Sequence, residues 1–395
     1  MENREEPLEN PGQRVTRKWF TCCTVVFSIS IAIGFLVTIV GIVFFFKCGE
    51  IVVNEIVRRT PLIEGNPTYQ AFIAKSIPIQ LKFYFFNLTN AEALPENKER
   101  PKFNEIGPYC YNVTKERSNF EFNKEKSQLS FQERSFFQFD KNATIVGKGE
   151  NDTFDQLDLV NFIGSSLAPS KLAKVLDFIG RKTVTKNFTV GGFLWGHPDG
   201  LFALMMKSVV GKKEEKQKAP TKFGILIGAN GSSTSFTIDT GNKNLDRYQK
   251  LVKFDGFNGT VDNWPERLVN VSNSTKLNEI IGTFGAAFRP NLNWNDELIY
   301  FLTLLRIPLY FVYNRLSMVR AFYTFRFNMD LTKFYEMTKT INDFHCQHGA
   351  EVCLPGGVLN ITSIVRVPIF ITLPHFLGVE SNKGLVRITK ITKRR

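Results

Sequence analysis

The stretch from Trp19 to Phe46 reads WFTCCTVVFSISIAIGFLVTIVGIVFFF and has no charged side chain in 28 consecutive residues. Basic residues precede it and Lys47 ends it. About 20 apolar residues suffice to cross the hydrocarbon core of a bilayer, and tilt takes up a surplus. A cleaved signal peptide would have an apolar region of only about 7–15 residues that ends in small residues, whereas this stretch ends in three phenylalanines. Residues 19–46 are therefore predicted to form an uncleaved transmembrane helix.

Glycosylation signals indicate on which side of the membrane the rest of the chain lies. Basic residues flank the helix on both sides, so the positive-inside rule is ambiguous. Asn-x-Ser/Thr sites occur ten times where chance would give roughly four, and all of them follow the helix. The predicted glycosylation sites are Asn87, Asn112, Asn142, Asn151, Asn187, Asn230, Asn258, Asn270, Asn273 and Asn360. Residues 47–395 are then lumenal or extracellular, and residues 1–18 are cytoplasmic.

Beyond the helix the chain has the composition of a folded domain. Of the 395 residues, 43% are hydrophobic and 13% are aromatic, with 38 phenylalanines, so global disorder is excluded. The net charge is +13, but six of the positive charges lie in the last fifteen residues, and no nucleic-acid-binding motif accompanies them. No internal repeat or low-complexity linker divides residues 47–395, which we expect to form one large domain.

The six cysteines divide by compartment. Cys22 and Cys23 lie at the cytoplasmic end of the helix, where reducing conditions exclude a structural disulfide. They are either lipidation sites for S-acylation or small apolar residues. The other four cysteines lie in the oxidising compartment, and Cys48 and Cys110 either pair or stay free.

Cys346 and Cys353 have the spacing of a local disulfide. Six residues that include Gly349 separate them, a loop short enough to close easily, so we expect a bridge. His345 and His348 lie beside this pair, but a zinc site would need a second cluster of ligands. We predict no metal site and no cofactor.

Alternating apolar and polar residues indicate strands along most of the remaining chain. The predicted strands are residues 77–86, 130–140, 225–227, 323–327 and 366–373. Another apolar run, Leu298–Tyr313, contains Arg306 and Pro308 and is too short to span a membrane, so we interpret it as a buried strand. Because these strands are spread over roughly 300 residues, the core is predicted to be a sheet or a barrel.

Residues 157–210 are the helical exception. An apolar stripe with the spacing of a helix packed on one face consists of Leu172, Val175, Leu176 and Ile179. A second edge of the same helix carries Lys171, Lys174, Phe178, Arg181 and Lys182. This basic edge is either a solvated face or an exposed site for anionic amphipaths, because the cations attract the anion and the phenylalanine contacts an acyl chain.

Motifs of catalysis are scarce, and we predict that the protein is not an enzyme. The sequence has four histidines and neither a nucleophile elbow, a zinc-protease motif nor a phosphate-binding glycine loop. Asp239-Thr240-Gly241 has the form of an aspartic protease motif. Aspartic proteases need two carboxylates that share a proton, and the sequence contains no second Asp-Thr/Ser-Gly motif. We interpret it as a turn after a strand.

Five collinear motifs resemble those of the class B scavenger receptors, which include fatty-acid and lipoprotein receptors and a lysosomal integral membrane protein. They are Ile77–Asn90, Arg100–Tyr111 with its Gly107-Pro108-Tyr109-x-Tyr111 core, Leu194-Trp195-Gly196, Phe223-Gly224 and Pro368–Leu377. The resemblance covers residues 19 to about 378. It implies an α+β fold, in which an antiparallel β-barrel ectodomain with an apolar tunnel is capped by a helical bundle. By the same resemblance, the helical apex at about residues 157–210 would hold the ligand-binding residues of the basic edge.

The chain also departs from this family. The resemblance implies further ectodomain strands and a second transmembrane helix after the Pro-His-Phe motif, and the sequence lacks them, so we expect a truncated form. Leu305, Ile364 and Val365 stand where cysteines are common in the family. Cys346 and Cys353 resemble a retained bridge.

The function predicted from these observations is that of a scavenger-type receptor at the cell surface. It would bind lipid, lipoprotein particles or other anionic ligands and pass lipid through the tunnel to the membrane. The alternative is a lysosomal or endosomal sorting receptor that binds a lumenal protein through the helical apex. A homo-oligomer is a further candidate assembly. The plasma membrane is the predicted location, with the lysosomal or endosomal membrane as the alternative.

Overall fold

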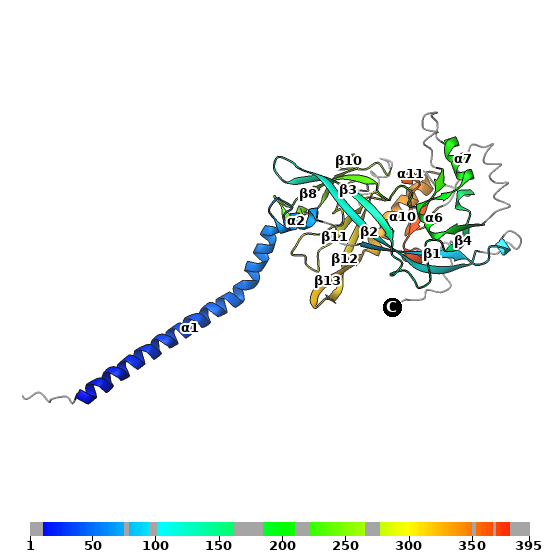
Figure 1. Cartoon of the computed structure of the whole chain (residues 1–395). Helices are drawn as coiled ribbons and strands as arrows, with labels where there is room; N and C mark the ends of the chain where they lie inside the picture. Colours follow the sequence, from blue (N-terminus) through cyan, green and yellow to red (C-terminus); the bar gives the residue numbers. More distant parts are fainter. Residues whose placement is uncertain are drawn as a thin grey trace, which may run out of the picture. The chain divides into compact units, whose positions relative to one another are not determined.

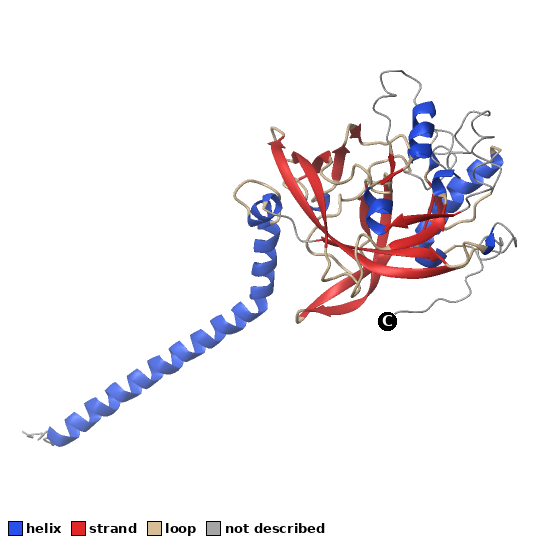
Figure 2. Cartoon of the chain, turned by 45° about the vertical axis from the view of Figure 1, so that its right-hand side comes forward, coloured by secondary structure: helices blue, strands red, loops and turns tan. Residues whose placement is uncertain are grey.

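The computed structural model describes residues 11–74, 79–94, 101–161, 185–209, 221–264, 277–349, 353–365 and 369–379. The chain forms two compact units, Met1–Thr60 and Pro61–Arg395. The first consists mainly of one long helix, and the second is a mixed α/β body built around antiparallel sheets (Figures 1 and 2).

The long helix α1 extends well beyond the predicted transmembrane stretch. It runs from Pro11 to Arg59, not from residue 19 to residue 46. Within the described residues it is the helix long and apolar enough to cross a membrane. Ion pairs between neighbouring turns carry the helix past its apolar part: Lys47 Nζ lies 2.8 Å from Glu50 Oε2, and Arg58 Nη2 lies 2.7 Å from Glu55 Oε1. The prediction missed this polar continuation because it used the uncharged stretch to set the bounds. An uncharged stretch indicates which residues can lie in the membrane, but it does not indicate where the helix ends.

The largest sheet of the second unit has the strand order β1-β2-β3-β8-β9-β10, and its neighbouring strands are antiparallel. Its strands are β1 (Ile79–Leu88), β2 (Phe103–Phe122), β3 (Gln128–Phe139), β8 (Ser233–Asp239), β9 (Leu251–Phe254) and β10 (Phe257–Asn258). The predicted strands at residues 77–86 and 130–140 correspond to β1 and β3.

The register of β1 on β2 shifts between Phe83 and Phe85, close to Gly107 in the Gly-Pro-Tyr motif. Gly107 has a φ of 127°, and a Cβ at this position would lie 2.7 Å from the backbone oxygen of Phe83. Only glycine tolerates both the conformation and the close approach.

A three-stranded antiparallel sheet follows, with the order β11-β12-β13. Its strands are β11 (Leu298–Leu302), β12 (Ile307–Val319) and β13 (Phe322–Met329). Three two-stranded sheets pair β4 (Thr153–Leu157) with β5 (Thr185–Thr189), β6 (His197–Pro198) with β7 (Lys222–Phe223), and β14 (Val358–Asn360) with β15 (Phe370–Thr372).

Thr283 links the two larger sheets. It bridges Lys250, which precedes β9, and Tyr300 of β11. Its backbone N–H donates to Ile299 O over 2.9 Å, and its carbonyl accepts from Phe301 N over 2.9 Å. This link does not close a barrel, because β1 and β13 remain unpaired edges in the described part of the chain. The barrel and its helical cap stay predictions.

The helices of the second unit are short except for one. They are α2 (Pro67–Ile73), α6 (Val190–Trp195), α7 (Gly200–Val209), α10 (Leu331–Gln347) and α11 (Thr362–Val365), with single 3-10 turns at Leu245–Arg247 and Pro374–Phe376. The side chain of Asp330 starts α10 as its N-cap and accepts from the backbone N–H groups of Thr332 and Lys333. The predicted helix along the basic edge lies outside the described residues, and residues 157–210 also contain the strand β5, so this region is not wholly helical.

Two strand predictions were wrong. Residues 225–227 lie in a series of turns rather than in a strand. The apolar run Leu298–Tyr313 is not one strand, because the chain reverses between β11 and β12. At this reversal Leu305 N donates to Leu302 O over 3.2 Å, and Arg306 has a φ of 53°. Hydrophobicity alone cannot reveal a turn whose residues are themselves apolar.

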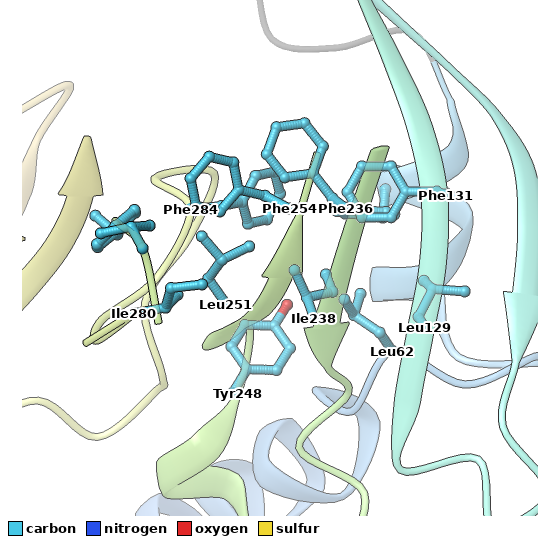
Figure 3. Packing of buried hydrophobic residues seen from close by; sticks show 13 residues of the cluster. Leu62, Leu129, Phe131, Phe236, Ile238, Tyr248, Leu251, Phe254, Ile280 and Phe284 are labelled. Carbon is cyan, nitrogen blue, oxygen red and sulfur yellow. The ribbon is translucent and has the colours of Figure 1, made fainter. Parts of the chain in front are cut away.

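Three apolar clusters form the core. The first packs α2 against β3, β8, β9 and β11, and Figure 3 shows the aromatic rings of Phe131, Phe236 and Phe254 beside Phe284. The second gathers the family-like motifs: Phe85 of β1, Tyr109 and Tyr111 of β2, and Phe193 and Leu194 of α6. The third lies between α10, β12 and the β14–β15 pair.

Candidate functional site

A pocket of about 500 Å³ adjoins the first apolar cluster. Its lining combines apolar and aromatic side chains with two cations: Thr68, Ala71, Phe72, Ile79, Lys115, Arg117, Tyr248, Gln249, Phe284, Gly285, Ala286, Ala287 and Tyr300. We call it the Arg117 pocket. Ligand pockets in proteins commonly measure about 300–1,000 Å³ and have this kind of lining.

Six segments of the second unit build the Arg117 pocket, and one of them is the start of β1, which contributes Ile79. The short helix α2 contributes Phe72, and the middle of β2 contributes Lys115 and Arg117. The other walls come from the turn at residues 248–249, the loop at residues 284–287, and Tyr300 of β11. The bridges of Thr283 hold the last two of these together, so the pocket lies where the two larger sheets meet.

A charge cluster lies in one wall of the pocket. Glu133 of β3 is only 5% exposed and pairs across the sheet with Arg117 of β2. Its Oε2 lies 2.9 Å from Arg117 Nε, and its Oε1 lies 2.8 Å from Lys115 Nζ. One carboxylate thus faces two cations, and the cluster has a net positive charge.

The guanidinium of Arg117 also packs on aromatic rings. Its Cζ lies 4.2 Å from the centre of the Phe72 ring and 5.7 Å from that of Phe284. Arg117 Nη1 donates a hydrogen bond to Phe72 O over 2.9 Å. These contacts hold a cation with only 9% of its side chain exposed against apolar walls.

The opposite wall holds a buried amide. Gln249 is 3% exposed, and its Nε2 donates to the hydroxyl oxygen of Tyr248 over 3.0 Å. Its Oε1 is buried as well and has no hydrogen-bond partner in the described part of the chain. Burial raises the pKa of both Tyr248 and Tyr300, so these walls stay neutral at physiological pH. The pocket therefore offers apolar surface beside a cluster with more cations than carboxylates, which suits an amphipathic anion.

The five residues predicted to bind ligand at the helical apex lie outside the described residues. They are Lys171, Lys174, Phe178, Arg181 and Lys182. Their role stays a prediction.

The structure describes most of the cysteines. Cys346 and Cys353 form a disulfide with their Cα atoms 5.1 Å apart. Cys48 and Cys110 are both free thiols in this structure. Cys110 is buried, and its Sγ donates to Ala143 O over 3.1 Å. Cys23 is exposed and free, whereas the side chain of Cys22 lies outside the described part.

Eight of the ten predicted glycosylation sites lie in described segments of the second unit. Six of these asparagines are exposed: Asn112, Asn142, Asn151, Asn187, Asn230 and Asn258. Asn87 and Asn360 are half-buried, and Asn87 Oδ1 accepts from Asp155 N over 2.8 Å. Asn270 and Asn273 lie outside the described residues.

Asp239 has a structural role. Its Oδ2 lies 2.8 Å from Arg247 Nε, and its Oδ1 accepts from Gly241 N over 3.0 Å. The carboxylate is thereby paired at the end of β8, which agrees with the interpretation of this motif as a turn.

Sequence reasoning missed the Arg117 pocket, although one signal was present. Tyr111, Val113, Lys115 and Arg117 alternate along β2 and so share one face. Tyr111 and Val113 are buried, which makes this the inward face and brings the two cations into the interior. Charged residues that continue an apolar face of a strand are a signal for a buried charge cluster.

Comparisons of the sequence with known proteins place the chain among related membrane proteins and receptors. The sequence pattern of the CD36 family matches residues 32–383. Scavenger receptor class B member 1 of Bos taurus is 24% identical over 358 residues, which cover 88% of this chain and 66% of that protein. Lysosome membrane protein 2 of Mus musculus is 24% identical over 335 residues, which cover 83% and 66%. Sensory neuron membrane protein 2 of Anopheles gambiae is 22% identical over 398 residues, which cover 82% and 68%.

These matches extend across nearly the whole chain, which spans about two thirds of the length of the curated relatives. Members of this family are receptors rather than enzymes. The apolar helix α1 agrees with the membrane location of the relatives, so the protein is a membrane protein. With its sequence matched from residue 32 to residue 383, the chain belongs to the CD36 family.

Proposed function

We propose that this protein is a scavenger-type membrane receptor that binds amphipathic anionic lipids in the Arg117 pocket. The observation that supports the proposal is the combination of a net positive charge cluster, Arg117 with Lys115 and Glu133, and aromatic walls in one pocket of about 500 Å³. The relatives named scavenger receptor support the receptor class.

The energetics favour a lipid over a small polar anion. Burial of an acyl chain contributes about 0.8 kcal/mol per methylene group, so a chain of several carbons against Phe72 and Phe284 accounts for most of the affinity. The carboxylate or phosphate of the lipid would offset the excess positive charge of the cluster.

Transport extends the same proposal. Further strands, in addition to those described, would close the sheets into the barrel. The Arg117 pocket would then be one part of an apolar tunnel that passes lipid to the membrane. Lipoprotein particles or other anionic ligands would first bind at the helical apex through the basic edge.

The pocket is tested by filling it. Ala287→Trp adds a large side chain to the pocket lining, whereas Val146→Trp adds the same side chain at a position that is 97% exposed and outside the pocket. We expect the full chain in detergent to bind a fluorescent fatty acid at least about tenfold more weakly after Ala287→Trp, a loss of about 1.4 kcal/mol, and unchanged after Val146→Trp. Equal affinities of the two variants would remove the pocket from the proposal.

The apex is tested separately. The triple change Lys171→Glu, Lys174→Glu and Lys182→Glu should abolish cellular uptake of anionic lipid particles, while surface expression stays normal, because repulsion replaces attraction at the capture site. Unchanged uptake would reject the apical site and leave the Arg117 pocket untouched.

The similarity to a lysosome membrane protein favours one alternative function, a sorting receptor for a lumenal protein in lysosomes or endosomes. Steady-state imaging and affinity purification of the full chain distinguish the two. An endosomal location with a co-purified soluble hydrolase supports sorting, and a cell-surface location with bound lipid supports the scavenger-type receptor.

A further inference from the structure

The β12–β13 hairpin exposes large apolar side chains at its tip. Phe322 and Tyr323 are 74% and 78% exposed, and the neighbouring exposed apolar residues are Leu316, Met318, Val319 and Phe325. In Figure 1 the hairpin extends beyond the neighbouring strands of its unit. We call residues 315–326 the hairpin tip. An apolar patch of this kind marks a surface that another molecule covers.

The strand register gathers most of these side chains on one face. Leu316 is opposite Phe325, and Met318 is opposite Tyr323. Side chains that directly face each other across an antiparallel pair lie on the same side of the sheet. The ring of Phe325 also packs 5.7 Å from that of Tyr313, which continues the apolar face toward the body. The hairpin tip is therefore a flat apolar and aromatic surface rather than a scatter of single residues.

Arginines lie on the opposite face of the hairpin and in its turn. Arg315 is directly opposite Arg326, and Arg320 lies in the turn between the strands. Like charges in such a pair destabilise a hairpin unless an anion lies between them. None of the three arginines forms an ion pair within the described segments. The sequence contains no Asp or Glu between Glu297 and Asp330, so the hairpin itself supplies no counter-charge.

These features fit a phospholipid surface better than a second copy of the chain. A two-fold interface through the apolar face would leave Arg315 and Arg326 of both copies on its outer sides, where no acidic residue of the hairpin offsets their charge. A phospholipid surface offers hydrocarbon for the apolar face and phosphate groups for the arginines, whose long stems can follow the apolar surface. Tyrosine at the tip suits the interface between hydrocarbon and headgroups. Since α1 belongs to the same chain, the second unit stays tethered to a bilayer.

We propose that the hairpin tip docks on a phospholipid surface, with Leu316, Met318, Tyr323 and Phe325 in the outer hydrocarbon and Arg315, Arg320 and Arg326 at the phosphates. This docking is separate from lipid binding in the Arg117 pocket, because the two sites share no residue.

Fluorescence quenching tests the proposal on the full chain in lipid nanodiscs. In Tyr323→Trp, the emission added over the wild type should be quenched when phosphatidylcholine carries bromine on its acyl chains near the headgroup. A separate sample receives brominated vesicles outside ordinary nanodiscs, which distinguishes the host bilayer from a second lipid surface. Quenching in either sample supports docking. Val146→Trp is the exposed control and should be quenched in neither.

A second variant separates docking from folding. Arg315→Glu would place opposite charges across the strands and so should stabilise the hairpin, while it weakens the attraction to phosphate. We expect Arg315→Glu to lower the quenching of the tryptophan at position 323 at least about twofold without any loss of thermal stability. Absence of quenching in both samples, equal quenching at positions 146 and 323, or a dimer cross-linked through the hairpin tip would overturn the proposal.

Discussion

Glu133 is a buried residue, and its removal should lower the free energy of unfolding of the second unit. It contacts both Arg117 and Lys115, and Arg117 is itself almost fully buried. In Glu133→Ala the buried guanidinium of Arg117 loses its counter-charge, and an uncompensated buried charge costs about 3–5 kcal/mol of unfolding free energy. Chemical denaturation of the full chain measures this loss.

The matched control is Glu64→Ala. It removes the exposed pair between Glu64 and Lys126 and should cost at most about 1 kcal/mol. Addition of a fatty acid provides a second readout, because its carboxylate would replace the missing one and restore part of the lost stability. Similar effects of the two alanine variants would mean that the charge cluster is solvated.

Tyr109 should make stability depend on alkaline pH. Burial, assisted by the nearby Asp152 carboxylate, raises the pKa of Tyr109 to about 12 from 10.0. The folded state therefore holds the phenolic proton more tightly than the unfolded chain. Its contribution is fully present below pH 10 and is lost as the pH rises through 12, a loss of about 2–3 kcal/mol.

The variant Tyr109→Phe isolates this effect. It loses the hydrogen bond to Asp152 Oδ2, so it should be about 1 kcal/mol less stable than the wild type at pH 8. Without a titrating hydroxyl it should lose less stability between pH 10 and pH 12, so the two curves should converge and then cross. Parallel curves from denaturant titrations at each pH would contradict the assigned shift.

At the scale of elements, the sequence predicted strands well where one face is buried and the other is not. Residues 77–86, 130–140 and 323–327 alternate, and residues 79–86, 130–139 and 323–327 lie in β1, β3 and β13. The failures lie where apolar residues are continuous, as at residues 225–227 and in the run Leu298–Tyr313. There the turns depend on backbone conformations such as the positive φ of Arg306, which apolar patterning does not encode.

The disulfide at the end of α10 makes a prediction at this scale. The double variant Cys346→Ala and Cys353→Ala opens a short loop, and chain entropy predicts a loss of at most about 2–3 kcal/mol. Other contacts retain the returning segment, since Asn342 Nδ2 donates to both Pro355 O and Val358 O over 2.8 Å. We therefore expect the core of α10 to stay folded and only its last turn to lose protection from hydrogen exchange.

Cys23→Ala provides the control for thiol removal at an exposed position and should leave exchange in α10 unchanged. Loss of protection along the whole of α10 in the double variant would show that the disulfide, rather than the Asn342 contacts, holds the returning segment.

At the scale of the whole molecule, the sequence predicted the anchor helix and the protein family better than it predicted the binding site. The anchor helix was predicted from a long uncharged stretch, and the family from five collinear motifs. Both patterns extend over many residues, so an error at a few positions does not change the prediction. The Arg117 pocket depends on side chains from six segments of the chain, which meet only in the folded unit. Only tertiary packing brings these segments together. The periodicity of the sequence could therefore reveal the inward face of β2, but not the residues that pack opposite this face.

The orientation of the whole chain across the membrane is the final prediction. If the second unit is lumenal or extracellular, the six exposed sequon asparagines are accessible to glycosylation, whereas Asn87, with its side-chain oxygen already bonded, should be modified less completely. In mammalian cells, enzymatic removal of N-glycans should lower the apparent mass, and each single Asn→Gln change at an exposed site should remove one step. An N-terminal epitope tag should react with antibody only after permeabilisation, because residues before the helix would be cytoplasmic. An unmodified chain, or a tag accessible on intact cells, would reverse the orientation and place the Arg117 pocket and the hairpin tip on the cytoplasmic side.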